Sequence, residues 1–365
     1  MRSTPLLIAM ISVIATPLRS QVPDSTAVVR EASRCRWLLF PSLGAAPETG
    51  LQFGSGLLTV CESRTDPETT RPSSLNASAL GTLKQQARVS IRLDRWAADN
   101  ARMTTGSLIW QTFPLPYFGI GDGTPESARE LYNPRGVEAS VEAQQRFARG
   151  WYIGGGVRHV ARRISTDSSG VLRQGRILGT ADGPISELLV SLQRDTRDNI
   201  FATERGVWVR LNYARSVQGI VSDYSYGRLR ADGRLFRTIS GRHVVALQAQ
   251  MIGIDGAVPF DQMPLVGGSE ILRGYELGRY RDRWLAAAQG EYRTPFVRRI
   301  GAVAFAGAGL VAPSFDALVS QRFLPTYGVG LRGQLDARKR TAIRADFGWG
   351  RPGSSGLYLG LNQAF

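Results

Sequence analysis

The 365-residue chain has only one long apolar run, and it is too short to cross a bilayer as a helix. This run occupies residues 5–15, and no later segment offers 18 consecutive apolar residues. A basic start, a short apolar run and a polar exit are typical of a secretory signal peptide. We therefore predict a signal peptide at 1–20 with cleavage near Ser20, a short periplasmic segment at 21–34 and a folded domain at 35–365.

Lysine is almost absent. Lys84 and Lys339 are the only two, so arginine supplies nearly all of the formal net charge of +15. In a soluble protein such an excess would suggest nucleic acid or another polyanion as a partner. Export argues against nucleic acid and favours anionic lipid head groups, or a cationic channel.

Residues that could carry catalysis or hold a cofactor are also few. His159 and His243 are the only histidines and lie far apart in the chain, and there is no Gly-x-Ser-x-Gly elbow. A serine-based membrane phospholipase would need a nucleophile, a histidine and an orienting group together. The GIGDG and GAG fragments lack the following helix pattern of a nucleotide loop. We therefore predict no enzyme activity, no catalytic residue, no metal site and no cofactor.

Cysteine is limited to Cys35 and Cys61, and an exported chain meets oxidising conditions. Cys35 opens the first predicted strand and Cys61 closes the second. A hairpin centred on Glu48 would place them opposite each other, close enough for a disulfide. We predict a disulfide that braces this hairpin.

What the sequence has in abundance is apolar–polar alternation. In 356–365, for example, Leu357, Leu359 and Phe365 share one face, and small or polar residues share the other. Strict alternation predicts strands with one apolar and one polar face. Segments of about ten residues also have the length of tilted membrane-spanning strands.

Sixteen such segments follow one another, and an even number is usual for an antiparallel single-chain barrel. Short turns follow most even segments and long connections follow several odd ones, as in barrels with short periplasmic turns and long outer loops. We predict an all-β fold, a 16-stranded antiparallel transmembrane β-barrel in the bacterial outer membrane; a water-soluble sandwich would rarely need so many strands. The predicted strands are 35–43, 50–62, 74–82, 85–97, 102–113, 136–147, 150–163, 185–195, 205–216, 222–238, 241–254, 284–294, 300–311, 325–335, 340–350 and 356–365.

The same alternation places ten arginines on the polar face, which lines the lumen of a barrel. Two interpretations are open: a cationic lumen that favours anions or an acidic substrate, and a charge network that fills and stiffens the interior. The acids expected on this face are fewer, namely Glu138, Glu142, Glu187, Glu291 and Asp346. The arginines are Arg88, Arg92, Arg158, Arg162, Arg210, Arg228, Arg230, Arg234, Arg332 and Arg344.

Five short motifs and the last residue carry a resemblance to a known family. The motifs are APETGLQFG (46–54), YFGIGDGT (117–124), QRDTRDNIFATERG (193–206), LRGY (272–275) and EYRTPF (291–296). In this order they resemble the barrels of the BamA/TamA superfamily, also called the bacterial surface antigen family. The terminal Phe365 resembles the aromatic C-terminal signal of outer-membrane proteins.

The resemblance implies that the sixth extracellular loop folds back and docks its tip on the inner wall. The implied roles are Arg273 as ionic anchor, Gly274 as a backbone that approaches closely, Tyr275 as packing ring and Glu291 as the partner of the arginine. An arginine withdrawn from bulk water needs a carboxylate and good hydrogen bonds. We call this predicted assembly the loop lock.

The sequence departs from the family pattern at two places. A second acid usually follows in a Phe-x-Asp-x-Gly pattern, but here FAGAG puts Gly307 at that position, and we name Asp346 as the candidate substitute. Family members that assemble or secrete proteins carry POTRA domains, for which residues 21–34 leave no room. The chain thus resembles a short branch without POTRA domains.

The function implied by the resemblance is assistance with protein or lipid insertion or translocation at the outer membrane. The alternative is a passive, anion-favouring pore partly plugged by the loop that carries Arg273-Gly274-Tyr275. Expected partners are outer-membrane lipid, a separate periplasmic protein, and the barrel-assembly machinery for the chain's own insertion. The junction of the first and last strands corresponds to the family's proposed lateral gate. Pro41 lacks a ladder donor in the first strand, and Gly356 and Gly360 weaken the last strand, which fits an opening seam and an irregular rim equally.

Overall fold

The computed structural model describes residues 35–63, 70–166, 170–199, 202–336, 341–361 and 363–365. The predicted signal peptide at 1–20 and the segment at 21–34 lie outside the described residues. The described part consists of β-strands, four short 3-10 helices and their connections. Among the described residues, no helix is both long enough and apolar enough to cross a membrane.

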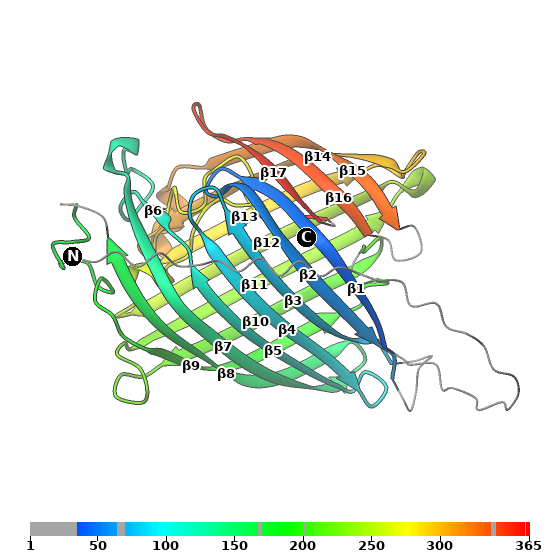
Figure 1. Ribbon diagram of the computed structural model, residues 1–365, viewed down its shortest axis with the longest axis horizontal. Coiled ribbons are helices and arrows are strands. Elements are labelled where there is room, and N and C mark those ends of the chain that lie inside the picture. The colour runs from blue at the N-terminus through cyan, green and yellow to red at the C-terminus, as the bar shows by residue number, and fades with distance from the viewer. Residues whose placement is uncertain (1–34, 64–69, 167–169, 200–201, 337–340, 362) are drawn as a thin grey trace, which may run out of the picture. The chain divides into compact units, whose positions relative to one another are not determined.

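The strands form one antiparallel sheet that closes on itself (Figure 1). Strand β6 has only three residues and pairs beside β5 with the same neighbour, β7, so sixteen spanning strands make the closed barrel. The prediction of a 16-stranded antiparallel barrel is confirmed. The strands are β1 (Cys35–Ala46), β2 (Gly50–Cys61), β3 (Ser73–Thr82), β4 (Ala87–Ala97), β5 (Arg102–Thr112), β6 (Leu115–Tyr117), β7 (Glu130–Ala148), β8 (Trp151–Thr166), β9 (Ile185–Asp195), β10 (Gly206–Ser216), β11 (Tyr226–Thr238), β12 (Val244–Gly256), β13 (Trp284–Arg293), β14 (Ile300–Ala312), β15 (Leu324–Asp336), β16 (Thr341–Trp349) and β17 (Ser355–Leu361).

The exposed face of the strands is the apolar one. In β9, Val190 and Leu188 are 60% and 69% exposed, whereas Ser191 and Gln193 on the opposite face are only 4% and 3% exposed. This arrangement inverts that of a soluble protein, because large apolar side chains point outward and polar ones point inward. The outer face is therefore suited to lipid, and the inner face lines the lumen.

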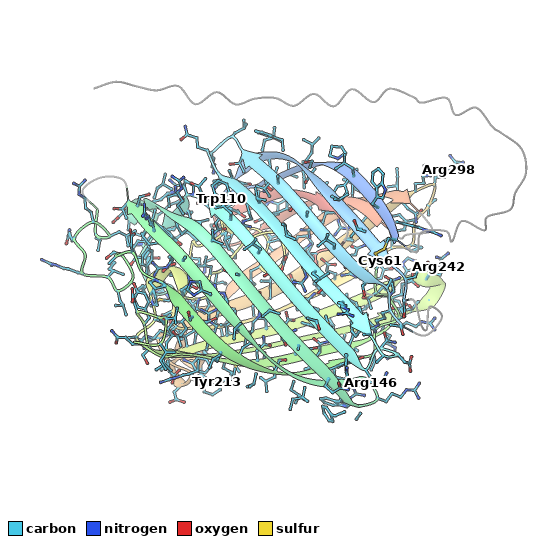
Figure 2. The ribbon with its side chains drawn as sticks, turned by 60° about the horizontal axis from the view of Figure 1, so that its bottom comes forward. Cys61, Trp110, Arg146, Tyr213, Arg242 and Arg298 are labelled. Carbon is cyan, nitrogen blue, oxygen red and sulfur yellow. A yellow bond between two sulfur atoms is a disulfide. The ribbon has the colours of Figure 1, made fainter. Side chains whose placement is uncertain are left out.

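The two ends of the barrel differ. Figure 2 shows Trp110 and Tyr213 at one end and Cys61, Arg146 and Arg242 at the other. The Cys61 end carries mostly short turns, such as the two residues between β7 and β8, and we call it the turn end. The opposite end, which we call the loop end, carries the long connections β5–β7, β8–β9 and β12–β13. In barrels of this architecture the short turns face the periplasm.

A buried arginine joins two of the long connections at the loop end. Arg281 is fully buried and donates hydrogen bonds to the hydroxyl of Tyr132 at 3.3 Å and to the main-chain oxygens of Phe260 at 3.3 Å and Pro116 at 2.9 Å. The guanidinium also lies 5.2 Å from the Tyr132 ring and 5.6 Å from the Phe260 ring. One side chain thus joins the β12–β13 connection to β6, in the β5–β7 connection, and to strand β7.

The junction between the first and last strands is the most weakly paired. Strand β1 pairs with β2 along its whole length, from Cys35↔Cys61 to Ala46↔Gly50. On its other side, Ala45↔Leu359 is the one Cα pair that joins β1 to β17 within the described residues. We call this junction the seam.

Candidate functional site

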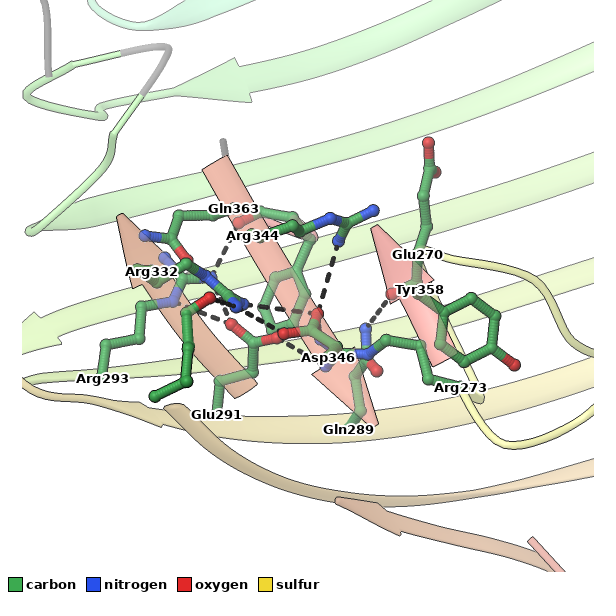
Figure 3. A network of polar contacts seen from close by, with 12 residues as sticks. Glu270, Arg273, Gln289, Glu291, Arg293, Arg332, Arg344, Asp346, Tyr358 and Gln363 are labelled. Carbon is green, nitrogen blue, oxygen red and sulfur yellow. Dashed lines mark hydrogen bonds and ion pairs between the residues drawn. The ribbon is translucent and has the colours of Figure 1, made fainter. Parts of the chain in front are cut away.

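The connection between β12 and β13 brings Arg273 against the inward faces of two strands (Figure 3). Its side chain is fully buried and donates from Nη1 to Oδ2 of Asp346 at 2.6 Å, and from Nη2 to Oε1 of Glu291 at 2.5 Å. The guanidinium carbon lies 3.6 Å from the centre of the Phe305 ring. Two carboxylates and an aromatic face therefore offset the loss of hydration of the arginine.

Both carboxylates are shared with further arginines. Arg293 donates from Nε to Glu291 at 2.9 Å, Arg332 binds Asp346, and Nη1 of Arg344 lies 3.8 Å from Oδ2 of Asp346. Arg332 and Arg344 are direct cross-strand partners on β15 and β16, an arrangement that is unfavourable for like charges unless an anion lies between them. With the tip arginine, four guanidinium groups share two carboxylates, so the side-chain charge of this cluster is +4 − 2 = +2. We call it the tip cluster.

The two residues after Arg273 bind the last strand and the loop end. The N–H of Gly274 donates to the hydroxyl of Tyr358 on β17 at 2.9 Å, and that hydroxyl donates to the main-chain oxygen of Tyr275 at 3.0 Å. Gly274 has φ +118°, and a Cβ there would lie 2.5 Å from the carbonyl carbon of Trp349, so only glycine fits. The tip is thus bonded directly to the strand that borders the seam.

Tyr275 is fully buried and packs by its edge on Tyr280, with ring centres 5.9 Å apart. Its hydroxyl donates to the main-chain oxygen of Pro325 at 2.8 Å and accepts from the N–H of Arg351 at 3.0 Å. Burial raises the pKa of this hydroxyl above its ordinary value, so it remains protonated and able to donate. The tyrosine therefore joins the tip to β15 and to the connection after β16.

Gly307 lies on the inward face of β14, at the position where the family pattern has an acid and this sequence departs from it. A Cβ at Gly307 would lie 2.5 Å from the main-chain oxygen of Ala288 and 2.8 Å from Cβ of Gln289, so no side chain fits without a shift. Gln289 instead donates to the main-chain oxygen of Glu270, in the loop, at 2.8 Å. The second carboxylate contact of the tip arginine comes from Asp346.

Most of the ten lumen arginines are engaged in ion pairs. Arg88 and Arg230 make none within the described residues; Arg88 instead donates to the side chain of Gln111 at 3.1 Å. The pairs are Arg92–Asp94, Arg158–Glu138, Arg158–Glu187, Arg162–Asp261, Arg210–Glu142, Arg228–Glu187, Arg234–Asp232, Arg332–Asp346 and Arg344–Asp346. This arrangement matches the charge-network interpretation more closely than a freely cationic lumen.

Three of the acids in these pairs, Asp94, Asp232 and Asp261, were not predicted from the sequence. Asp94 and Asp232 lie two residues from Arg92 and Arg234 on the same strands, so alternation already places each acid beside its arginine. Asp261 lies in the β12–β13 connection, where no strand period applies. Burial raises the pKa of Asp261, although its arginine partner opposes the shift.

The two cysteines lie directly opposite each other on β1 and β2 and are bonded, with an S–S distance of 2.07 Å. They join the two ends of the hairpin at the turn end of the barrel. Among the residues that the structure describes, no group of three or more histidine, cysteine or acidic side chains could hold a metal ion.

The last residues depart from the predicted strand 356–365, because β17 ends at Leu361. Arg332 donates to the side chain of Gln363 at 2.9 Å, and Arg293 donates to the main-chain oxygen of Phe365 at 2.8 Å. Since both arginines belong to inward faces, these contacts draw the end of the chain toward the lumen and away from β1. The prediction that Phe365 continues the outward apolar face of the strand is therefore wrong.

The family model of the Omp85 superfamily domain matches residues 71–365. The chain belongs to the Omp85 superfamily. It is an integral outer-membrane β-barrel of a superfamily whose members act in insertion and translocation and work with periplasmic or lipoprotein partners. No curated protein matches the chain.

Two solved structures have a similar fold. BamA from Haemophilus ducreyi lacking POTRA domains 1–3 gives a TM-score of 0.59 at 12% identity, covering 91% of this chain and 70% of that one. CdiB from Acinetobacter baumannii gives a TM-score of 0.58 at 13% identity, covering 91% of this chain and 60% of that one. At these identities the comparison concerns the fold of the barrel.

Proposed function

We propose that this Omp85 barrel assists the insertion or translocation of protein or lipid at the outer membrane, by opening its seam. The observation that carries the proposal is that one Cα pair joins β1 to β17 within the described residues. Every other pair of neighbouring spanning strands shares at least the seven pairs that join β16 to β17. The seam is therefore the junction that needs the least energy to open.

Opening the seam would release strand edges into the membrane. Within the described residues, positions 36–43 of β1 pair with β2 and have no Cα partner on β17, and a strand edge of this kind can pair with an added strand. Pro41 has no N–H and so removes one donor from this part of the edge. An incoming strand would pair with the main-chain groups along this part of the β1 edge.

We propose that the loop tip is held inside the lumen and acts as the lock of this seam. Arg273 binds β13 and β16, and Gly274 binds Tyr358 of β17. One short segment therefore connects three strands that lie on the β17 side of the seam. Release of the tip would remove these contacts together. The cationic surplus of the tip cluster lowers the energy needed for release, because the four arginines repel one another.

Depletion of the protein in its host tests this function. An insertion or translocation factor should give an envelope defect that a plasmid copy reverses, and should co-purify with a periplasmic partner in mild detergent. A depleted strain with an intact envelope and unchanged outer-membrane protein and lipid content would contradict the proposal.

A passive, anion-favouring pore is the second candidate. It is favoured by Arg230, which is exposed in the lumen and has no ion pair within the described residues. If the protein is such a pore, its reversal potential in planar bilayers should show a preference for anions. The substitution Arg230→Gln should weaken that preference. No preference in the open wild type would exclude it.

A further inference from the structure

The outward face of the barrel carries an unusual charge arrangement near the loop end. Arg135 on β7 and Arg163 on β8 are directly opposite each other in the register of these strands. Both are on the same face as the exposed residues Val137 and Val157, which is the face suited to lipid. Direct cross-strand neighbours have Cβ atoms about 4.5–5.5 Å apart, and like charges in this relation are destabilising.

Neither arginine is neutralised by a close ion pair. Arg135 has no ion pair within the described ranges, and Arg163 is 86% exposed, with Nε 3.9 Å from the carboxylate of Asp182. Asp182 is itself half-exposed and accepts a hydrogen bond from the N–H of Ile164 at 2.9 Å. The two guanidinium groups therefore keep most of their hydrogen-bonding capacity for an anion.

The depth of the pair in the membrane follows from an aromatic neighbour. Trp110 on β5 is the direct partner of Val137 and is partly exposed on the outward face at the loop end (Figure 2). Tryptophan on the outer face of a membrane protein lies at head-group level. Arg135 is two residues beyond Val137 toward the loop end, so the arginine pair lies at or just outside the boundary between acyl chains and head groups.

We propose that Arg135 and Arg163 form a binding site for a phosphate-bearing lipid head group in the leaflet at the loop end of the barrel. Two forked guanidinium groups can bind one phosphate through several charge-assisted hydrogen bonds. The anion would also remove the repulsion between the two cations. Below the pair, Val137, Val141 and Val157 are exposed and provide an apolar surface for the acyl chains. We call this the phosphate pair.

Lipid is favoured over a protein partner by position. The site lies on the outward face of two spanning strands, beside apolar residues that are themselves exposed, and not on the connections that project from the loop end. A site of this kind is surrounded by lipid whether or not the lumen is occupied. The proposal does not depend on seam opening or on the loop lock.

Native mass spectrometry of the full chain in detergent tests the proposal. We expect the wild type to retain phosphatidic acid in preference to phosphatidylcholine, and the double variant R135Q/R163Q to bind phosphatidic acid about tenfold or more weakly. The variant R135K/R163K should keep most of the binding, because it keeps both charges. Gel mobility before and after heating establishes that each variant is folded.

The matched control is R194Q/R237Q, which removes two outward-facing arginines near the turn end. It should leave the binding of phosphatidic acid at the loop-end site unchanged. An equal loss in both double variants would overturn the proposal, since binding would then follow total charge. Inorganic phosphate should compete only weakly with phosphatidic acid. If inorganic phosphate bound as tightly as phosphatidic acid, the site would be one for free phosphate and the proposal of a lipid ligand would be overturned.

Discussion

Asp346 is the residue whose loss should disturb the loop tip most. Its carboxylate is near the guanidinium groups of Arg273, Arg332 and Arg344. The substitution Asp346→Asn removes one of the two negative charges, and the side-chain charge of the tip cluster rises from +2 to +4 − 1 = +3. Removing one partner of a buried ion pair typically costs 3–5 kcal/mol. We therefore expect D346N to lower the free energy of unfolding by about 3–5 kcal/mol.

Removing a cation should cost less than removing this anion. In R273M, Glu291 and Asp346 keep Arg293 and Arg332 as partners, and the methionine still fills the buried space. We expect R273M to lower the free energy of unfolding by less than about 3 kcal/mol, because replacing this buried ion by an apolar side chain leaves no uncompensated charge. Adding R344Q to D346N should restore part of the stability, because it removes a surplus cation.

The assay is a urea titration of the barrel in lipid vesicles, followed by the mobility of unheated samples on a gel. The control is D94N, the same chemical change in the Arg92–Asp94 pair on β4, whose side chains are 58% and 23% exposed. An exposed pair contributes about 0–1 kcal/mol. The reasoning is refuted if D346N differs from D94N by less than about 1 kcal/mol, or if R273M is the more damaging change.

Three further predictions concern the neighbours of the tip and the first hairpin. Tyr358→Phe removes both hydrogen bonds between β17 and the tip, so we expect the free energy of unfolding to fall by about 1–3 kcal/mol and the β12–β13 connection to be cut faster by a protease. An unchanged rate of proteolysis would show that the hydroxyl of Tyr358 does not hold the tip. Gly307→Asp should not rescue D346N, because a Cβ there would lie 2.5 Å from a main-chain oxygen of β13; a rescue of stability would show that this wall can shift. Cys35 and Cys61 should resist alkylation until the protein is reduced. Replacing both cysteines by serine should lower the free energy of unfolding by about 2–4 kcal/mol. Two alkylatable thiols and equal gel mobility with and without reductant would contradict the disulfide.

Much of the barrel could be predicted because its strands obey a period of two and its outer face is apolar. All sixteen predicted segments overlap spanning strands of the structure. Alternation fails where tertiary contacts decide the course of the chain. The pattern continues through Phe365, but β17 ends at Leu361, because Arg293 and Arg332 bind the residues that follow. No local pattern contains that information.

The tip cluster was only partly predictable. The motif around Arg273 and the alternation at Glu291 indicated one ion pair, and the inward face of Asp346 suggested a second. The role of Tyr358 was missed, since a tyrosine on the inward face of a strand carries no signal that it binds a loop 84 residues away in sequence. Arg281 was missed for the same reason, because its partners include a main-chain oxygen of β6 and the Tyr132 hydroxyl on β7, both far from it in sequence.

The central claim is that the barrel works by opening between β1 and β17. Cysteines introduced at Ala45 and Leu359, the one paired position of this seam within the described residues, would join the two strands when oxidised. A matched cross-link between Gly233 and Ala249 would join β11 to β12, which are already paired along thirteen residues. The account predicts that the oxidised seam variant fails to reverse the depletion defect and recovers on reduction, whereas the control cross-link has no effect. Full activity of the oxidised seam variant would contradict the account.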